Sequence, residues 1–133
     1  GTWHCVGSDE NIHSDTKVEY LQDGSFRGDA KLKVDDDGNV LAYHVVGAGK
    51  WRFTNNALTQ SQIKYSEVSR QHSPATLAWL EESENGRFLE SMMYIGLVAE
   101  MDKPGKDDVY QLDKSGKLVS EDGASREVCT KVK

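Results

Sequence analysis

The sequence is poor in cysteine and proline, has no long apolar run and carries no excess of positive charge. Two cysteines and two prolines occur among 133 residues. The longest apolar run, Met92–Ala99, has 8 residues, whereas a membrane-spanning helix needs about 20. Lys and Arg number 16 against 22 Asp and Glu, a net charge of −6. This balance argues against nucleic acid as a partner and against docking on an anionic membrane.

The two cysteines, Cys5 and Cys129, lie near opposite ends of the chain. Both fall in short strand-like runs, and the first and last strands of a closed sheet are neighbours, so we predict a disulfide between them. Two unrelated buried thiols are the alternative. A disulfide is typical of an oxidising compartment, so we expect a periplasmic or secreted protein. The chain begins at Gly1 without Met or a signal peptide, as a mature or trimmed chain does, and a lost anchor before Gly1 is compatible with this.

Short strand-like runs separated by turn signals predict a single domain, residues 1–133, built as an antiparallel meander. Asp23-Gly24, Asn55-Asn56 and Asp122-Gly123 are typical hairpin turns. Gly47-Ala48-Gly49 predicts a bend or bulge in the sheet. The predicted strands cover 3–6, 16–22, 25–34, 40–46, 50–54, 57–68, 108–113, 118–120 and 126–132, and residues 7–15 are expected to be a polar stretch.

The pattern changes after residue 72 and predicts a helical insertion over about 73–101. Ser73-Pro74 is typical of a helix N-cap followed by proline at the first helical position. Asn85-Gly86 is expected to end or kink the first helix. From Arg87 to Met101 apolar residues recur at helical spacing, with Glu90 and Glu100 as the ends of the second helix. A strand over Met92–Ala99 is the alternative, and Lys103-Pro104-Gly105 ends the segment.

The expected fold is mainly β, an eight- to nine-stranded antiparallel up-and-down barrel with the helical insertion before the last strands. Closure removes the two free edges that an open sheet would leave, and a two-sheet sandwich is the alternative. Because Val128 and Val132 share a face, the disulfide is expected on the outer face or near a rim. The residues predicted to point inward are Trp3, Val18, Tyr20, Phe26, Leu32, Val34, Tyr43, Val45, Trp51, Phe53, Leu58, Val109, Leu118, Val128 and Val132.

The order of several short segments resembles that of small bacterial lipocalin-like (calycin-like) domains. The segments are Gly1-Thr2-Trp3, 20–26, 49–53 and Asn56-Ala57-Leu58. The helical insertion followed by a short closing hairpin is similar to the ToxS-like and VtrC-like periplasmic accessory proteins of membrane-bound regulators in vibrios. This resemblance implies a periplasmic barrel that pairs with a membrane-anchored protein and holds a small hydrophobic ligand.

The sequence contains no recognisable catalytic or metal-binding pattern. The four histidines, His4, His13, His44 and His72, show no ligand spacing. The acidic segment 35–39 has consecutive carboxylates and an early glycine, which favours a solvated turn over a calcium loop. No nucleophile elbow, Cys-x-x-Cys pair or phosphate loop occurs. We therefore expect no enzymatic activity, no cofactor and no metal.

Two sets of apolar side chains are the candidate functional residues. The first would line a barrel pocket for a small hydrophobic ligand, with Arg52 and Tyr65 at its rim; ordinary core filling is the alternative. It comprises Trp3, Tyr20, Phe26, Tyr43, Trp51 and Phe53. The second would bind a membrane-anchored protein or form a homodimer, unless it packs on the barrel itself. It comprises Phe88, Met92, Met93 and Ile95. An interior of several hundred Å³ would favour the ligand, and a filled one the interface.

Overall fold

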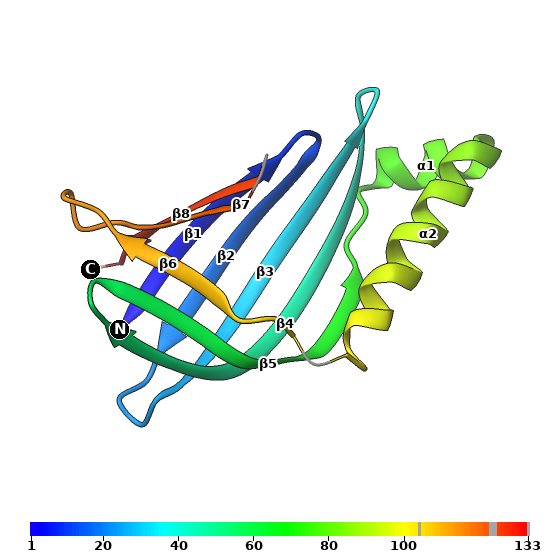
Figure 1. Ribbon diagram of the computed structural model, residues 1–133. Helices are drawn as coiled ribbons and strands as arrows, with labels where there is room; N and C mark the ends of the chain where they lie inside the picture. The colour runs from blue at the N-terminus through cyan, green and yellow to red at the C-terminus, as the bar shows by residue number, and fades with distance from the viewer. Residues whose placement is uncertain (104, 123–124, 133) are drawn as a thin grey trace.

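The computed structural model describes residues 1–103, 105–122 and 125–132 (Figure 1). Over these ranges the chain forms eight strands and two helices, and the strands close into an antiparallel barrel in which β8 returns to pair with β1. The elements are β1 (Thr2–Asp9), β2 (Ile12–Tyr20), β3 (Ser25–Asp36), β4 (Asn39–Thr54), β5 (Ala57–Arg70), α1 (Pro74–Glu82), α2 (Glu84–Glu100), β6 (Asp108–Leu112), β7 (Leu118–Asp122) and β8 (Ser125–Lys131). The predicted barrel and helical insertion are confirmed.

The hairpin turns form where short polar residues accept left-handed backbone angles. Gly24 has a φ of 88°, and the Asp23 carboxylate accepts the backbone N–H of Ser25 at 2.9 Å. Asn55 and Asn56 both have positive φ, as a tight two-residue hairpin requires. One hairpin was not predicted, because the expected polar stretch 7–15 is the end of β1, a turn and the start of β2. The predicted turn at 122–123 and the stop at Pro104 involve residues outside the described ranges.

The predicted bend at residues 47–49 is confirmed as a bulge inside a single strand, β4. The β4–β5 register shifts between Val46 and Gly47 and again after Ala48. A Cβ at Gly49 would lie 2.7 Å from the Ser61 carbonyl oxygen and 2.8 Å from the Phe26 ring. Only glycine permits that approach, so the bulge brings β4 close to both β5 and the Phe26 side chain.

The disulfide between Cys5 and Cys129 is present, but its predicted position on the outer face or rim is wrong. The two residues face each other in the β1–β8 pair and are 1% and 0% exposed. Cys129 points into the barrel, so Val128 and Val132, which were predicted to point inward, lie on the outer face. Val132 is exposed. Phe53 and Val109 are also exposed, which corrects their predicted inward placement.

The helical insertion covers one end of the barrel, beside the projecting β3–β4 hairpin (Figure 1). Ser73 caps α1 and Pro74 begins it, as predicted, and the strand alternative for 92–99 is wrong. The helices pack on Val34, Leu41 and Tyr43, which continue the inward-facing rows of β3 and β4. The contacting helical side chains are Trp79, Leu80, Leu89, Met93, Tyr94 and Leu97. Among the described residues, no helix has the length and apolar character needed to cross a membrane.

Candidate functional site

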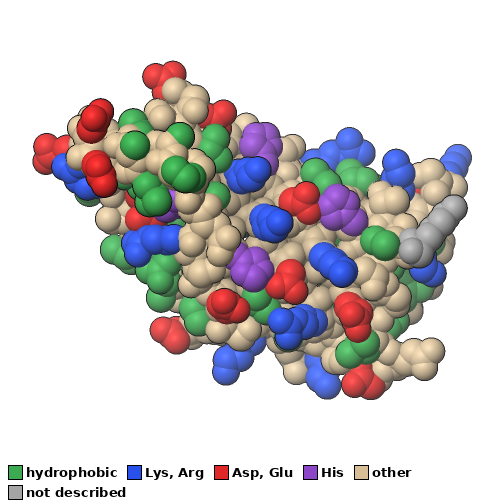
Figure 2. All heavy atoms as spheres, turned by 180° about the vertical axis from the view of Figure 1, so that it is seen from behind, with side chains coloured by type: hydrophobic (Ala, Val, Ile, Leu, Met, Phe, Trp, Pro, Cys, Tyr) green, Lys and Arg blue, Asp and Glu red, His purple; other side chains and the backbone are tan. Residues whose placement is uncertain are grey.

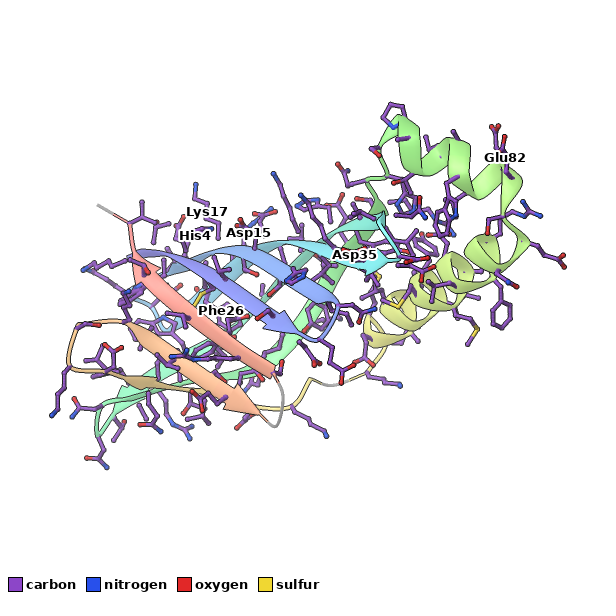
Figure 3. The ribbon with its side chains drawn as sticks, turned by 90° about the horizontal axis from the view of Figure 1, so that it is seen from above. His4, Asp15, Lys17, Phe26, Asp35 and Glu82 are labelled. Atoms are coloured by element: carbon purple, nitrogen blue, oxygen red, sulfur yellow. A yellow bond between two sulfur atoms is a disulfide. The ribbon has the colours of Figure 1, made fainter. Side chains whose placement is uncertain are left out.

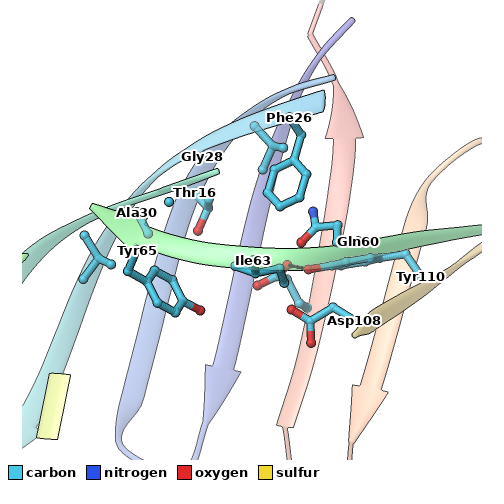
Figure 4. A pocket seen from close by; sticks show the side chains of 13 residues that line it. Thr16, Phe26, Gly28, Ala30, Gln60, Ile63, Tyr65, Asp108 and Tyr110 are labelled. Atoms are coloured by element: carbon cyan, nitrogen blue, oxygen red, sulfur yellow. Dashed lines mark hydrogen bonds between the residues drawn. The ribbon is translucent and has the colours of Figure 1, made fainter. Parts of the chain in front are cut away.

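Among the described residues, a small cavity lies in the barrel interior beneath the bulged part of β4 and β5. Its volume is about 130 Å³, and Phe26, Gln60, Ile63, Tyr65 and Tyr110 surround it (Figure 4). A packed core that includes the disulfide occupies the barrel interior around it. The cavity therefore has the size of a single small ring rather than of a lipid.

The floor of this cavity is polar and acidic. The Tyr110 hydroxyl donates to Glu127 Oε1 at 2.5 Å, and Gln60 Nε2 donates to the Tyr20 hydroxyl at 2.7 Å. Burial raises the pKa of the Glu127 carboxyl above its ordinary value, and burial raises the pKa of Tyr20 to about 12. Asp108 also lines the cavity. An apolar ligand placed here would lie against polar side chains with which it forms no hydrogen bond.

The six aromatic residues predicted to line a ligand pocket do not form one surface. Phe26 lines the cavity, and Tyr20 lies in the surrounding core with Trp3 and Trp51 packed against it. The remaining two lie elsewhere: Tyr43 is beneath the helices and Phe53 is 46% exposed on the outside. Of the two predicted rim residues, Tyr65 lines the cavity and Arg52 is exposed on β4. Four of the aromatic side chains therefore fill the barrel, which is the alternative that the sequence left open.

One group of possible metal-ligand atoms stands out in the described part of the chain. Atoms of Cys5, Glu127 and Cys129 lie within 4.8 Å of one another. The two sulfur atoms are bonded to each other, however, and a disulfide does not supply the thiolates that bind metal. The donor set therefore does not fit a metal ion.

A second group of titratable residues lies on the outer face of β1–β4. His4 Nε2 is 2.7 Å from Asp15 Oδ1, and His44 Nε2 is 3.0 Å from Asp29 Oδ1. Figure 2 shows histidines on this face set among lysines and acidic side chains, and Figure 3 shows His4 and Asp15 pointing away from the barrel. Opposite charges alternate here on an open surface, which is the arrangement of a solvated sheet face.

Glu90 attaches α2 to the barrel, and sequence reasoning missed it by placing it at a helix end. It lies inside α2, is 7% exposed, and accepts hydrogen bonds from Arg70 Nε (3.0 Å), His72 Nε2 (3.0 Å) and the Tyr43 hydroxyl (2.9 Å). Burial raises the pKa of this carboxyl, but the hydrogen bonds outweigh burial and leave the pKa below its ordinary value. The carboxylate thus stays charged where the helix meets the sheet.

The partners of Glu90 are themselves held in place. His72 Nδ1 accepts the backbone N–H of Ala42 at 3.0 Å, so the ring proton is on Nε2 and points at Glu90. The Arg70 guanidinium lies 3.7 Å above the Tyr94 ring of α2. The inner face of α2 is therefore fixed by both polar and apolar contacts, and α2 presents one constant face to its surroundings.

The outer face of α2 carries an apolar row, defined as Phe88, Met92, Ile95 and Ala99. Phe88 is 68%, Met92 57% and Ile95 63% exposed, and Ala99 is exposed beside them. Met93, which was predicted with this surface, instead packs inward against the barrel. The structure thus brings three of the four predicted partner-surface residues together on one exposed face.

The sequence matches no protein-family model and no curated protein.

Proposed function

We propose that this chain is a non-enzymatic interaction module in which the barrel is a scaffold and the outer face of α2 binds another protein. The observation that carries the proposal is the exposed apolar row on a helix whose opposite face is fixed by Glu90. Contiguous exposed apolar side chains cost free energy in water and mark interaction surfaces in soluble proteins. The network around Glu90 supports this role, because a surface held in one geometry loses less entropy on binding.

The barrel interior favours this function over storage of a hydrophobic ligand. Small-molecule sites usually enclose roughly 300–1,000 Å³, whereas the cavity measures about 130 Å³. Its lining includes Glu127, Gln60 and Asp108, which suit water or a very small polar molecule better than a lipid.

The proposal also includes the cellular location of the chain and its relation to lipocalin-like proteins. The Cys5–Cys129 disulfide supports a periplasmic or secreted location, because disulfides persist in oxidising compartments. A closed barrel with helices before its last strands supports the lipocalin-like identity and the likeness to ToxS-like and VtrC-like accessory proteins. The partner is then either a membrane-anchored regulator, as that likeness implies, or a second copy of the chain.

The proposal is tested by site-specific photo-crosslinking in the organism that makes the chain. We expect benzoylphenylalanine at Phe88 to give a discrete adduct that mass spectrometry identifies and that Met92→Lys abolishes. Benzoylphenylalanine at Phe53, an aromatic position exposed on the outside of the barrel, is the matched control. The same adducts from both positions, or no adduct from Phe88, would contradict the proposal. Native mass spectrometry showing a co-purified lipid would instead support the ligand function.

A further inference from the structure

We propose that the partner of α2 is a second copy of this chain, bound as an antiparallel pair of α2 helices. The two-fold axis would pass between residues 93 and 94 of each copy. The inference rests on the proposed function, because it names the partner for the same apolar row.

The spacing of the row is that of a helix–helix seam. Its members follow one another at intervals of four, three and four residues, which is the d-a-d-a order of a heptad repeat. Such spacing keeps all four side chains within one narrow stripe of a helix with 3.6 residues per turn. A stripe this narrow fits one neighbouring helix better than it fits a broad, flat surface.

The sizes of the side chains select the antiparallel order. Antiparallel pairing sets Met92 of one copy against Ile95 of the other, and Phe88 of each copy against Ala99 of the other. Phe88, the largest member of the row, then meets Ala99, the smallest, and the two side chains of intermediate size meet each other. A parallel pair would oppose Phe88 to Phe88 and Ala99 to Ala99, with crowding at one end and a gap at the other, and both features destabilise packing.

Gly96 independently supports the close approach of another helix to this face of α2. It lies in the interior of α2 and is exposed, and a Cβ at this position would meet nothing within 4 Å. Glycine weakens a helix relative to alanine, and no contact with the described residues of the same chain requires it here. In the antiparallel pair Gly96 lies level with Ser91 of the second copy, so small residues on both flanks let the backbones come close.

The distribution of charged residues along α2 is compatible with the antiparallel order. The apolar row and its flanking residues Ser91 and Gly96 carry no charge, so pairing buries no unpaired ion. Antiparallel order keeps the Glu84 side chains of the two copies at opposite ends of the pair, whereas parallel helices would set Glu84 beside Glu84. The net charge of −6 on each copy opposes association at long range. The contact is therefore weak and should tighten with added salt.

Sedimentation velocity of the full chain, from about 1 μM to about 1 mM, tests the pair. We expect a concentration-dependent monomer–dimer equilibrium. Met92→Lys should weaken it at least about tenfold, because it places two lysines in the centre of the seam. Val6→Lys makes the same change of charge at an exposed apolar position on β1 and should leave the equilibrium unchanged. Gly96→Gln should also weaken the dimer, although glutamine favours the helix.

Two results would overturn the inference. One is a wild-type chain that stays monomeric over the whole range, and the other is a dimer that Met92→Lys and Gly96→Gln leave intact. A monomeric chain that still crosslinks from Phe88 to a different protein would refute the second copy and leave the proposed function standing. If Met92→Lys does not fold by circular dichroism, Gly96→Gln decides the question alone.

Discussion

Cys5 and Cys129 lie directly opposite each other in the β1–β8 pair, and their disulfide joins the two strands at which the barrel closes. The two residues are separated by 124 positions in the sequence. Both side chains are buried in the core beside Leu118 and Tyr110. The bridge thus links β1 covalently to β8 and is also part of the packed core of the barrel.

Replacing both cysteines by alanine is expected to lower the free energy of unfolding by about 2–5 kcal/mol. The loss has two sources, the longer unrestrained unfolded chain and the void left in the core. Urea unfolding without reductant measures it. Reductant should bring the wild-type chain close to the variant and leave the variant unchanged. A variant as stable as the wild type would contradict the structural role of the bridge.

Replacing Glu90 by glutamine is expected to lower the free energy of unfolding by about 1–3 kcal/mol at pH 7. Glutamine removes the charge that Arg70 and His72 face across the helix–sheet contact. The pKa of Glu90 is lowered in the folded chain, so its contribution is present above the ordinary glutamate pKa and disappears as pH falls through the lower folded pKa.

Urea unfolding at a series of pH values checks this dependence. The difference between wild type and variant should persist from pH 7 to about pH 5 and close in more acidic solution. Glu100→Gln is the matched control, because Glu100 lies on the same helix but is exposed in a loose pair with Lys103. A difference that stays constant into strong acid, or an equal loss in the control, would refute the attachment role.

Replacing Glu127 by glutamine is expected to raise the free energy of unfolding at pH 7, the opposite of the effect expected at Glu90. Burial raises the pKa of Glu127, so the folded chain favours the protonated carboxyl and loses stability as pH rises past the ordinary glutamate pKa. An amide carbonyl can still accept from Tyr110. The gain should vanish below about pH 4, where both forms are neutral. Thermal unfolding measures the effect, and Glu121→Gln, at an exposed neighbouring position, is the control. Equal changes in the two variants would contradict the prediction.

Local patterns explain why most of the barrel could be predicted and part of the core could not. The turns at Asp23-Gly24 and Asn55-Asn56 depend on residues inside the turn itself, so their signals are present in a short segment. Which residues of β8 point into the barrel depends on its pairing with β1, at the other end of the sequence. The alternation of Val128 and Val132 therefore predicted the wrong inner face, and Cys129 points inward because it pairs with Cys5.

The candidate site shows the same division between local and distant causes. The spacing of the apolar row is a local helical pattern, and the predicted partner surface included three of its members, Phe88, Met92 and Ile95, together with Met93, which packs inward. The burial of Glu90 depends on Tyr43, Arg70 and His72, which lie 18 to 47 positions away in the sequence. Its only local signal was an acidic residue between Leu89 and the apolar run, and that pattern is equally typical of a helix end.

Two glycines of α2 are expected to respond in opposite ways to alanine. A Cβ at Gly86 would lie 2.8 Å from the Trp79 ring, so Gly86→Ala should separate α1 from α2 and lower the free energy of unfolding by about 1–3 kcal/mol. A Cβ at Gly96 would meet nothing, so Gly96→Ala should raise it by up to about 1 kcal/mol through helix propensity alone. Thermal unfolding in dilute solution, where the single chain is measured, separates the two effects. A loss of stability from Gly96→Ala would mean that Gly96 serves the packing of the single chain, and the close approach of a second helix would then lose its main independent support.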